Sequence, residues 1–210
     1  MTKEATQVDV TAEVAAIRRN VAIRQGREQE LVAVLASREF AAPASTLWDA
    51  ITNPGQLGHW FLPVSGDLRV GGKFQTEGNA GGEILACDAP TRLEVTWGDA
   101  SSTVELRLNE NAGTTRLELE HAVPLAFARN GAGALFVGPG WDGALAALNA
   151  YLRGEAPADP TAAASSLETQ RFNKEALHAW AAAVRESGTA SEEELAGMLQ
   201  VTLPHWAPNL

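Results

Sequence analysis

The sequence predicts an α+β domain in which an antiparallel sheet packs against one long helix. Segments at residues 92–97, 103–109 and 114–121 alternate between apolar and polar residues, as strands do when one face is covered and the other meets solvent. A later segment has apolar residues at spacings of four, three and four, the stripe of a helix that can cover such a sheet: Trp141, Leu145, Leu148 and Leu152. Short turns between the predicted strands favour antiparallel pairing.

The N-terminal part is expected to hold a short helix and a hairpin. Residues 9–17 have the pattern of a short helix, with Thr11 as its N-cap. Residues 21–23 alternate between apolar and polar side chains, and residues 31–40 are rich in Val and Leu. We expect these two segments to pair as a hairpin that turns at Gly26.

Two short helices should follow the hairpin. Trp48 and Ile51 lie three residues apart and therefore share one face of the first helix. Asn53 is a favourable N-cap for the second helix, and Pro54 suits its first turn.

The remaining strands are marked by glycine and turn residues. Gly71-Gly72 breaks the chain before a strand at residues 73–77, and further strands are expected at residues 82–87, 92–97, 103–109 and 114–121. The loop at residues 109–113 predicts a hairpin turn. Together with the first hairpin, these segments predict a sheet of six or seven strands.

The long helix is expected over residues 138–153, and the glycine-rich segment 131–138 before it is interpreted as a flexible turn. Residues 155–160 are a plausible linker, and residues 162–186 have the pattern of one Ala-rich amphipathic helix.

The end of the chain should carry one more helix. Ser187-Gly188 stops the preceding helix, and Ser191 with Glu194 forms a capping-box pattern that opens the last one. Residues 203–208 are interpreted as a tail. We therefore divide the chain into a domain at residues 1–154 and a helical extension at residues 155–210.

Composition excludes several function classes. The chain has 210 residues, is 45% hydrophobic and carries a net charge of −10, so its surface should repel nucleic-acid phosphates. No apolar run approaches the ~18 residues needed to span a membrane. Residues 1–5 lack an apolar signal core, and Cys87 is the only cysteine, which fits a cytoplasmic protein. We expect a monomer or a homodimer.

Catalytic and metal signatures are missing from the sequence. The four histidines, His59, His121, His178 and His205, have no metal-ligand spacing. Residues 131–138 lack the spacing of a dinucleotide-binding or phosphate-binding loop. We therefore expect no metal, no cofactor and no catalytic residue that sequence alone identifies.

A set of motifs in a fixed order resembles one known family. The motifs lie at residues 47–54, 59–61, 66–74, 87–97, 113–121 and 138–152. In this order they resemble the activator of heat shock protein 90 ATPase-like (polyketide cyclase-like) branch of the START-like SRPBCC superfamily. The resemblance implies a helix-grip fold, in which a curved antiparallel sheet wraps a long C-terminal helix and leaves a hydrophobic cavity between them.

The inward positions of the predicted sheet and helix give the candidate ligand-binding residues. These are Trp60, Phe61, Phe74, Trp97, Leu106, Leu119, His121, Trp141 and Leu145. We expect Trp60 and Phe61 at the mouth of the cavity. His121 continues the inward series of its strand, so it is the polar residue expected to meet the polar atoms of a ligand. Ordinary core packing is the alternative for the aromatic residues, and a hydrogen-bonded core histidine is the alternative for His121.

Three functions remain open at this point. The preferred one is binding of a small hydrophobic ligand, a lipid or an aromatic, polyketide-like molecule, as a carrier or sensor. The second is a protein-interaction module like the co-chaperone activators of heat shock protein 90 ATPase. The third is a cyclase-type or hydrolase-type enzyme that uses His121 or His59 with a cavity water, although the sequence displays no paired acid–base groups. The helical extension could be a lid over the cavity, a dimerisation arm, or a segment that only packs on the core.

Overall fold

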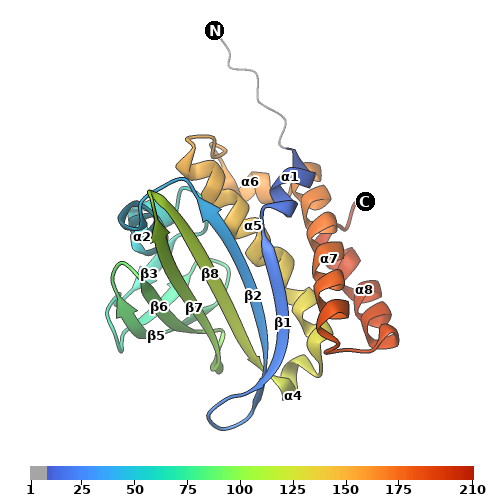
Figure 1. Ribbon diagram of the computed structural model, residues 1–210. Helices are drawn as coiled ribbons and strands as arrows, with labels where there is room; N and C mark the ends of the chain where they lie inside the picture. Colours follow the sequence, from blue (N-terminus) through green and yellow to red (C-terminus); the bar gives the residue numbers. More distant parts are fainter. Residues whose placement is uncertain (1–8) are drawn as a thin grey trace.

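The structure of the chain is a computed structural model that describes residues 9–210 (Figure 1). The segment without an apolar signal core, at residues 1–5, lies outside the described residues. The strands form one 8-stranded sheet in the order β1-β2-β8-β7-β6-β5-β4-β3. They are β1 (Arg18–Gln25), β2 (Glu30–Phe40), β3 (Val64–Gly66), β4 (Lys73–Thr76), β5 (Gly81–Asp88), β6 (Arg92–Trp97), β7 (Asp99–Asn111) and β8 (Thr114–Pro124).

Every pair of neighbouring strands is antiparallel, so the predicted α+β class is confirmed. The predicted count of six or seven strands is wrong by one because β3 is only three residues long. A strand of that length shows no alternation in the sequence. The β7–β8 hairpin turns at Ala112 and Gly113, whose φ angles of 50° and 79° match a tight two-residue turn.

The helices lie on the concave face and along one edge of the sheet (Figure 1). They are α1 (Val10–Ala15), α2 (Ala44–Thr52), α3 (Pro54–Leu57), α4 (Leu125–Ala128), the 3₁₀ turn η1 (Gly131–Gly133), α5 (Ala134–Leu152), α6 (Pro160–Ala164), α7 (Leu167–Ser187) and α8 (Glu192–Trp206). The long helix α5 runs along the inner face of the sheet, which confirms the expected helix-grip arrangement. Within residues 9–210, no helix is long and apolar enough to cross a membrane.

Two of the three predicted N-caps are correct. The side chain of Asn53 accepts a hydrogen bond from the Gly55 amide at 2.9 Å and opens α3. Ser191 and Glu194 form the predicted capping box of α8. Thr11, by contrast, is not the cap of α1, because Asp9 accepts the bond from the Ala12 amide instead.

The start of α5 corrects the interpretation of residues 131–138 as a flexible turn. The helix begins at Ala134, and Ala134 and Leu135 are fully buried. Glycine at position 138 is required by close packing, because a Cβ there would lie 2.5 Å from the Trp180 ring of α7. The glycines therefore allow two helices to approach closely, and only a contact between distant parts of the chain reveals this.

The C-terminal helices differ from the prediction in two places. The single helix expected over residues 162–186 is split, because Ser166 caps a new helix by accepting a hydrogen bond from the Thr169 amide at 3.1 Å. The expected tail at residues 203–208 is also wrong, since α8 continues to Trp206. Gly188 ends α7 in the left-handed conformation, with a φ of 64°, as predicted.

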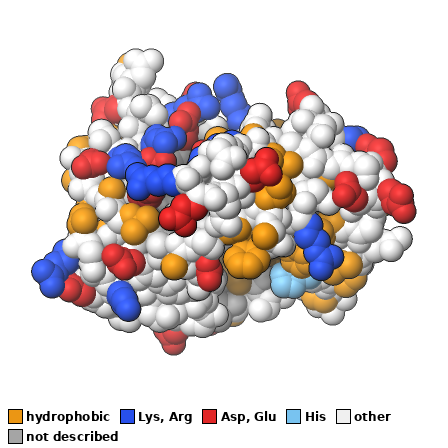
Figure 2. Space-filling view, turned by 90° about the horizontal axis from the view of Figure 1, so that it is seen from below, with side chains coloured by type: hydrophobic (Ala, Val, Ile, Leu, Met, Phe, Trp, Pro, Cys, Tyr) orange, Lys and Arg blue, Asp and Glu red, His pale blue; other side chains and the backbone are white. Residues whose placement is uncertain are grey.

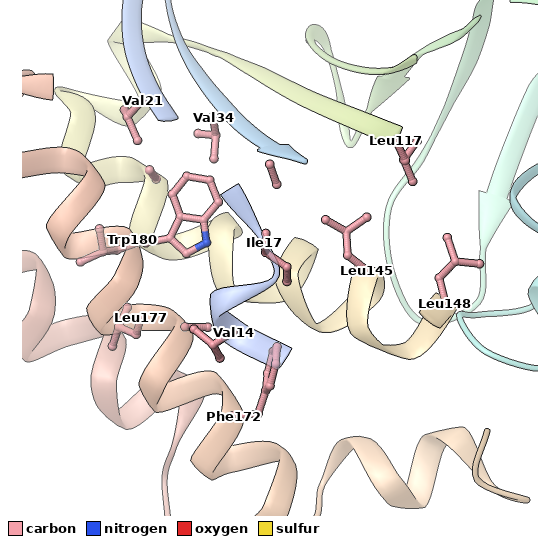
Figure 3. Packing of buried hydrophobic residues seen from close by; sticks show 14 of the residues in the cluster. Val14, Ile17, Val21, Val34, Leu117, Leu145, Leu148, Phe172, Leu177 and Trp180 are labelled. Atoms are coloured by element: carbon pink, nitrogen blue, oxygen red, sulfur yellow. The ribbon is translucent and has the colours of Figure 1, made fainter. Parts of the chain in front are cut away.

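The C-terminal helices share one core with the N-terminal segments. Trp180 of α7 is fully buried and packs among residues of β1, β2 and the segment between α1 and β1, including Ile17, Val21 and Val34 (Figure 3). The same cluster continues along α5 to Leu145 and Leu148 (Figure 3). Helices α7 and α8 therefore cover the side of α5 and the β1 edge of the sheet (Figure 1).

A buried ion pair joins β1 to α5 inside this core. Arg19 Nε donates to Asp142 Oδ2 at 2.8 Å, and the Asp142 side chain has no solvent exposure. The guanidinium also donates to the carbonyls of Ile17 and Val14, at 2.8 and 3.0 Å. Burial raises the pKa of Asp142 to about 7, while the neighbouring Arg19 opposes that rise.

The surface carries both signs of charge in close proximity. In Figure 2, acidic and basic side chains alternate over the face seen from below, with hydrophobic patches between them. Phe127 of α4 and Phe136 of α5 are among the exposed large hydrophobic residues, with 66% and 45% of their surfaces accessible.

Candidate functional site

A cavity of about 180 Å³ lies between the inner face of the sheet and α5. Helices α2 and α3 contribute Ile51 and Leu57 to its wall. Eight of the nine predicted site residues line it: Trp60, Phe61, Phe74, Trp97, Leu106, Leu119, Trp141 and Leu145. His121 does not line it. Whether these residues contact a ligand stays a prediction.

The nine predicted site residues make up only part of the wall. The further lining residues are Ile51, Thr52, Leu57, Val64, Leu68, Thr76, Ile84, Cys87, Leu93, Val95, Val104, Leu117, Ala144 and Leu148. Alternation on β6 and β7 already placed Leu93, Val95 and Val104 on the inner face. Leu68, in the loop before β4, has no periodic signal, because its position depends on how that loop folds over the sheet.

Three aromatic side chains form a continuous wall at one end of the cavity. The ring centroids of Phe74 and Trp97 lie 6.0 Å apart, and those of Trp97 and Trp141 lie 5.2 Å apart. Both pairs are tilted, a common geometry for interacting aromatic rings. This wall connects strands β4 and β6 to helix α5.

Most of the polar side-chain groups in the wall are already paired with the protein. Trp60 Nε1 donates to the carbonyl of Ala50 at 3.0 Å. The hydroxyl of Thr52 donates to the Trp48 carbonyl at 2.7 Å, and that of Thr76 donates to the Ala80 carbonyl at 2.5 Å. These groups hold the backbone of the wall in place and are not directed at a ligand.

His121 lies on the predicted inner face, but Trp141 separates it from the cavity. Trp141 Nε1 donates to His121 Nδ1 at 3.1 Å, and the two rings meet edge to face. His121 Nε2 lies 2.9 Å from the hydroxyl of Ser102. His121 is therefore outside the cavity lining and both of its ring nitrogens already have partners in the protein, while the expectation that it meets the polar atoms of a ligand stays a prediction.

These two hydrogen bonds determine which nitrogen of the neutral His121 ring carries the proton. Because Nδ1 accepts the indole proton, the neutral ring carries its own proton on Nε2 and donates it to Ser102. Burial lowers the pKa of His121 to about 4. The ring is thus a neutral structural group at ordinary pH.

The cavity reaches the surface near Leu68 and Cys87. Leu68 is 42% exposed and Cys87 is exposed, and both line the cavity. Trp60 is only 8% exposed, so it belongs to the buried wall and not to an open mouth; Phe61 is half-buried. His59, the other histidine considered for chemistry, is exposed and stacks on Tyr151 outside the lining.

The helical extension does not line the cavity. All lining residues fall between Ile51 and Leu148, whereas α7 and α8 pack on the other side of α5. Whether the extension acts as a lid, as a dimerisation arm or only by packing on the core stays a prediction. Among the described residues 9–210, no group of three or more His, Cys, Asp or Glu side chains could hold a metal ion.

Comparisons with known proteins give a consistent relationship. A sequence profile of the family described as activator of Hsp90 ATPase homolog 1-like protein matches residues 41–153. No curated protein matches the chain in sequence.

Solved structures show the same relationship in three dimensions. The crystal structure of CalU16 from Micromonospora echinospora is 35% identical, with a TM-score of 0.67, and the alignment covers 81% of this chain and 99% of CalU16. The solution structure of CalU16 gives 34% identity, a TM-score of 0.68, and coverage of 89% and 100%. DynU16, a protein in the dynemicin biosynthetic locus, shares the fold at 22% identity and a TM-score of 0.54, over 60% of this chain and 48% of DynU16.

Proposed function

The chain belongs to the family of activator of Hsp90 ATPase homolog 1-like proteins, within the SRPBCC superfamily, and on this premise we propose that its cavity binds a small hydrophobic ligand. The ligand is a lipid-like or an aromatic, polyketide-like molecule, and the protein acts as its carrier or sensor. Fold and family alone do not carry this proposal. The chemistry of the cavity wall does.

The observation that carries the proposal is the apolar wall with paired polar groups. The wall is built from aliphatic and aromatic side chains, and the hydrogen bonds of Trp60, Thr52, Thr76 and Trp141 are all directed into the protein. Among residues 9–210, the lining side chains that could still donate a hydrogen bond to a ligand are the Trp97 indole and the Cys87 thiol, and any other polar ligand atom would be left unpaired, at a cost of about 1–3 kcal/mol. The enclosed part of the ligand is therefore mostly hydrocarbon, and its polar atoms lie toward Trp97, Cys87 and the surface.

The volume sets the size of the enclosed part. At about 180 Å³ the cavity is smaller than pockets that bury a drug-sized molecule, which typically measure about 300–1,000 Å³. It is close to cavities of about 150 Å³ that hold benzene. One or two rings or a short acyl chain fit without rearrangement, and a larger ligand requires side chains such as Phe61 to move.

The wall chemistry favours binding over catalysis. Within residues 9–210, the lining contains no Asp, Glu, His, Lys or Arg, so an acid–base pair at the cavity would have to come from the ligand or from water. The likeness to DynU16 extends to the fold alone, and the aromatic rings of Phe74, Trp97 and Trp141 are what favours an aromatic ligand. An interaction module remains the alternative if the cavity proves to take no ligand.

Native mass spectrometry of freshly purified protein tests the proposal. We expect a retained mass of a small hydrophobic molecule on the wild type, or its appearance after incubation with fatty acids, flavonoids or aromatic polyketides. Ala144→Phe is the matched variant, because Ala144 lines the cavity and a larger side chain would fill it. A wild type that retains no added mass under any of these conditions would contradict the proposal.

A further inference from the structure

A three-residue hydrogen-bond chain runs from the cavity wall into the sheet. It starts at Trp141, passes through His121 and ends at Ser102 of β7, with distances of 3.1 and 2.9 Å. His121 and Ser102 are buried, with 4% and 6% of their surfaces accessible. The chain therefore joins helix α5 to two strands through groups that water does not reach.

The cavity ends where this chain begins. On β8 the lining includes Leu117 and Leu119 but stops before His121, the next residue on the inner face. On β7 the lining includes Val104, which pairs directly with His121 across the sheet. By its position on the strand His121 would thus be the next wall residue, and the Trp141 indole meets its ring edge to face. On α5 the lining runs from Trp141 to Leu148 and includes no earlier residue of that helix.

We propose that His121 is a positioning residue that fixes the Trp141 indole as the end wall of the cavity and thereby limits the size of the bound ligand. This inference rests on the proposed ligand-binding function. It gives His121 a role different from the one expected from the sequence: the residue selects ligands through Trp141, without touching them.

The chemistry of the bond explains how one residue can hold the wall. An indole has a single donor, Nε1–H, and no acceptor, so its hydrogen bonding is satisfied by one acceptor. His121 supplies the acceptor at Nδ1, and its Nε2–H is in turn anchored on Ser102. If position 121 offered no acceptor, the indole N–H would lose its partner in the protein, and a ring that turned toward another acceptor would no longer close this end of the cavity.

The test compares variants that differ in the acceptor. His121→Phe keeps a ring but removes the acceptor, whereas His121→Asn places an amide oxygen near the position of Nδ1 and should rescue the bond. Ser102→Ala removes only the hydrogen-bond partner of His121 Nε2. Leu177→Ala is the control for general loosening, because Leu177 is fully buried in α7 and lies outside the cavity lining.

Benzene, naphthalene and anthracene serve as probes of increasing size, with dissociation constants measured by titration calorimetry. We expect the affinity for the larger arenes, relative to benzene, to rise about tenfold in His121→Phe, equivalent to ~1.4 kcal/mol. His121→Asn and Leu177→Ala should keep the wild-type size preference, and Ser102→Ala should show a smaller change in the direction of His121→Phe. The indole N–H signal of Trp141 in NMR spectra should exchange with solvent faster in His121→Phe than in wild type.

Three results would overturn the inference. An unchanged size preference in His121→Phe, with the indole bond lost by NMR, would show that His121 does not set the limit although the cavity binds ligand. A wild type that binds none of the three arenes would remove the inferred size selection of aromatic ligands, whereas the proposed function fails only if fatty acids, flavonoids and aromatic polyketides also do not bind. A Leu177→Ala variant that changed preference as His121→Phe does would also contradict the inference, because loosening alone would then explain the effect.

Discussion

The Trp206 indole donates a hydrogen bond of 2.8 Å to the backbone carbonyl of Leu135, which lies 71 residues earlier in the chain. In a regular helix this carbonyl would accept from the amide of residue 139, but Pro139 has no amide hydrogen. The last helix thus supplies the donor that the sequence of α5 lacks. This contact explains how a proline is accommodated inside the helix that forms one wall of the cavity.

Replacing Trp206 by Phe should lower the free energy of unfolding by about 1–3 kcal/mol, because it leaves the Leu135 carbonyl without a donor. The matched background is Pro139→Ala, which restores the helical amide. In that background Trp206→Phe should lower the free energy of unfolding by less than it does in the wild-type background. Urea unfolding of the four proteins in this double-mutant cycle measures both decreases. Equal costs in both backgrounds would show that the hydrogen bond does not compensate for the proline.

Two glycines of α5 should respond in opposite directions to alanine. Gly138→Ala places a Cβ 2.5 Å from the Trp180 ring, so overpacking should destabilise the protein by about 1–3 kcal/mol. Gly143→Ala meets nothing within 4 Å and should stabilise the same helix by up to about 1 kcal/mol. Thermal unfolding of both variants gives the comparison. A Gly138→Ala protein as stable as Gly143→Ala would contradict the close packing of α5 and α7.

Replacing only one partner of the buried Arg19–Asp142 ion pair should strongly lower the free energy of unfolding. Arg19→Met leaves the Asp142 carboxylate buried without its cation, and we expect a loss of about 3–5 kcal/mol. Arg19→Met combined with Asp142→Leu removes both charges and should recover most of this stability. Chemical denaturation of the single and double variants is the measurement. If the double variant were no more stable than Arg19→Met, the loss would come from packing and not from the unpaired charge.

His121 should make stability depend on pH in a defined window. Its folded pKa of about 4 lies below the ordinary value of 6.5, so the unfolded chain takes up the proton first as the pH falls. The free energy of unfolding should therefore decrease between about pH 6.5 and pH 4, by about 3 kcal/mol relative to His121→Asn. Asp142, with a pKa raised to about 7, changes stability in the opposite direction, but it is present in both proteins and cancels in the difference.

Urea unfolding of wild type and His121→Asn across this range is the measurement, and the NMR titration of the His121 ring supplies its folded pKa directly. A stability difference between the two proteins that stays constant from pH 7 to pH 4 would contradict a buried, neutral His121.

The sequence predicted the sheet and the inner face well, because alternation on β6, β7 and β8 reports directly which side chains are covered. It failed where distant contacts decide the local structure. Residues 131–138 resemble a turn by composition, yet Trp180 and Trp206 make them the start of a buried helix. His121 was placed on the correct face, but nothing in its own strand shows that Trp141, from another element, covers it. Eight of the nine predicted residues thus line the cavity and His121 does not, and whether any of them contacts a ligand stays a prediction.

The central claim is that the space between the sheet and α5 takes a hydrophobic ligand, and a tryptophan-fluorescence titration tests it most directly. Trp97 and Trp141 stand in the cavity wall, so a ligand bound there should change their emission. Wild type and Ala144→Phe are titrated in parallel with fatty acids, flavonoids and aromatic polyketides. We predict saturable binding of at least one compound to wild type at micromolar concentration, weakened at least about tenfold in Ala144→Phe. No binding by any compound, or equal affinity in the filled variant, would contradict the account.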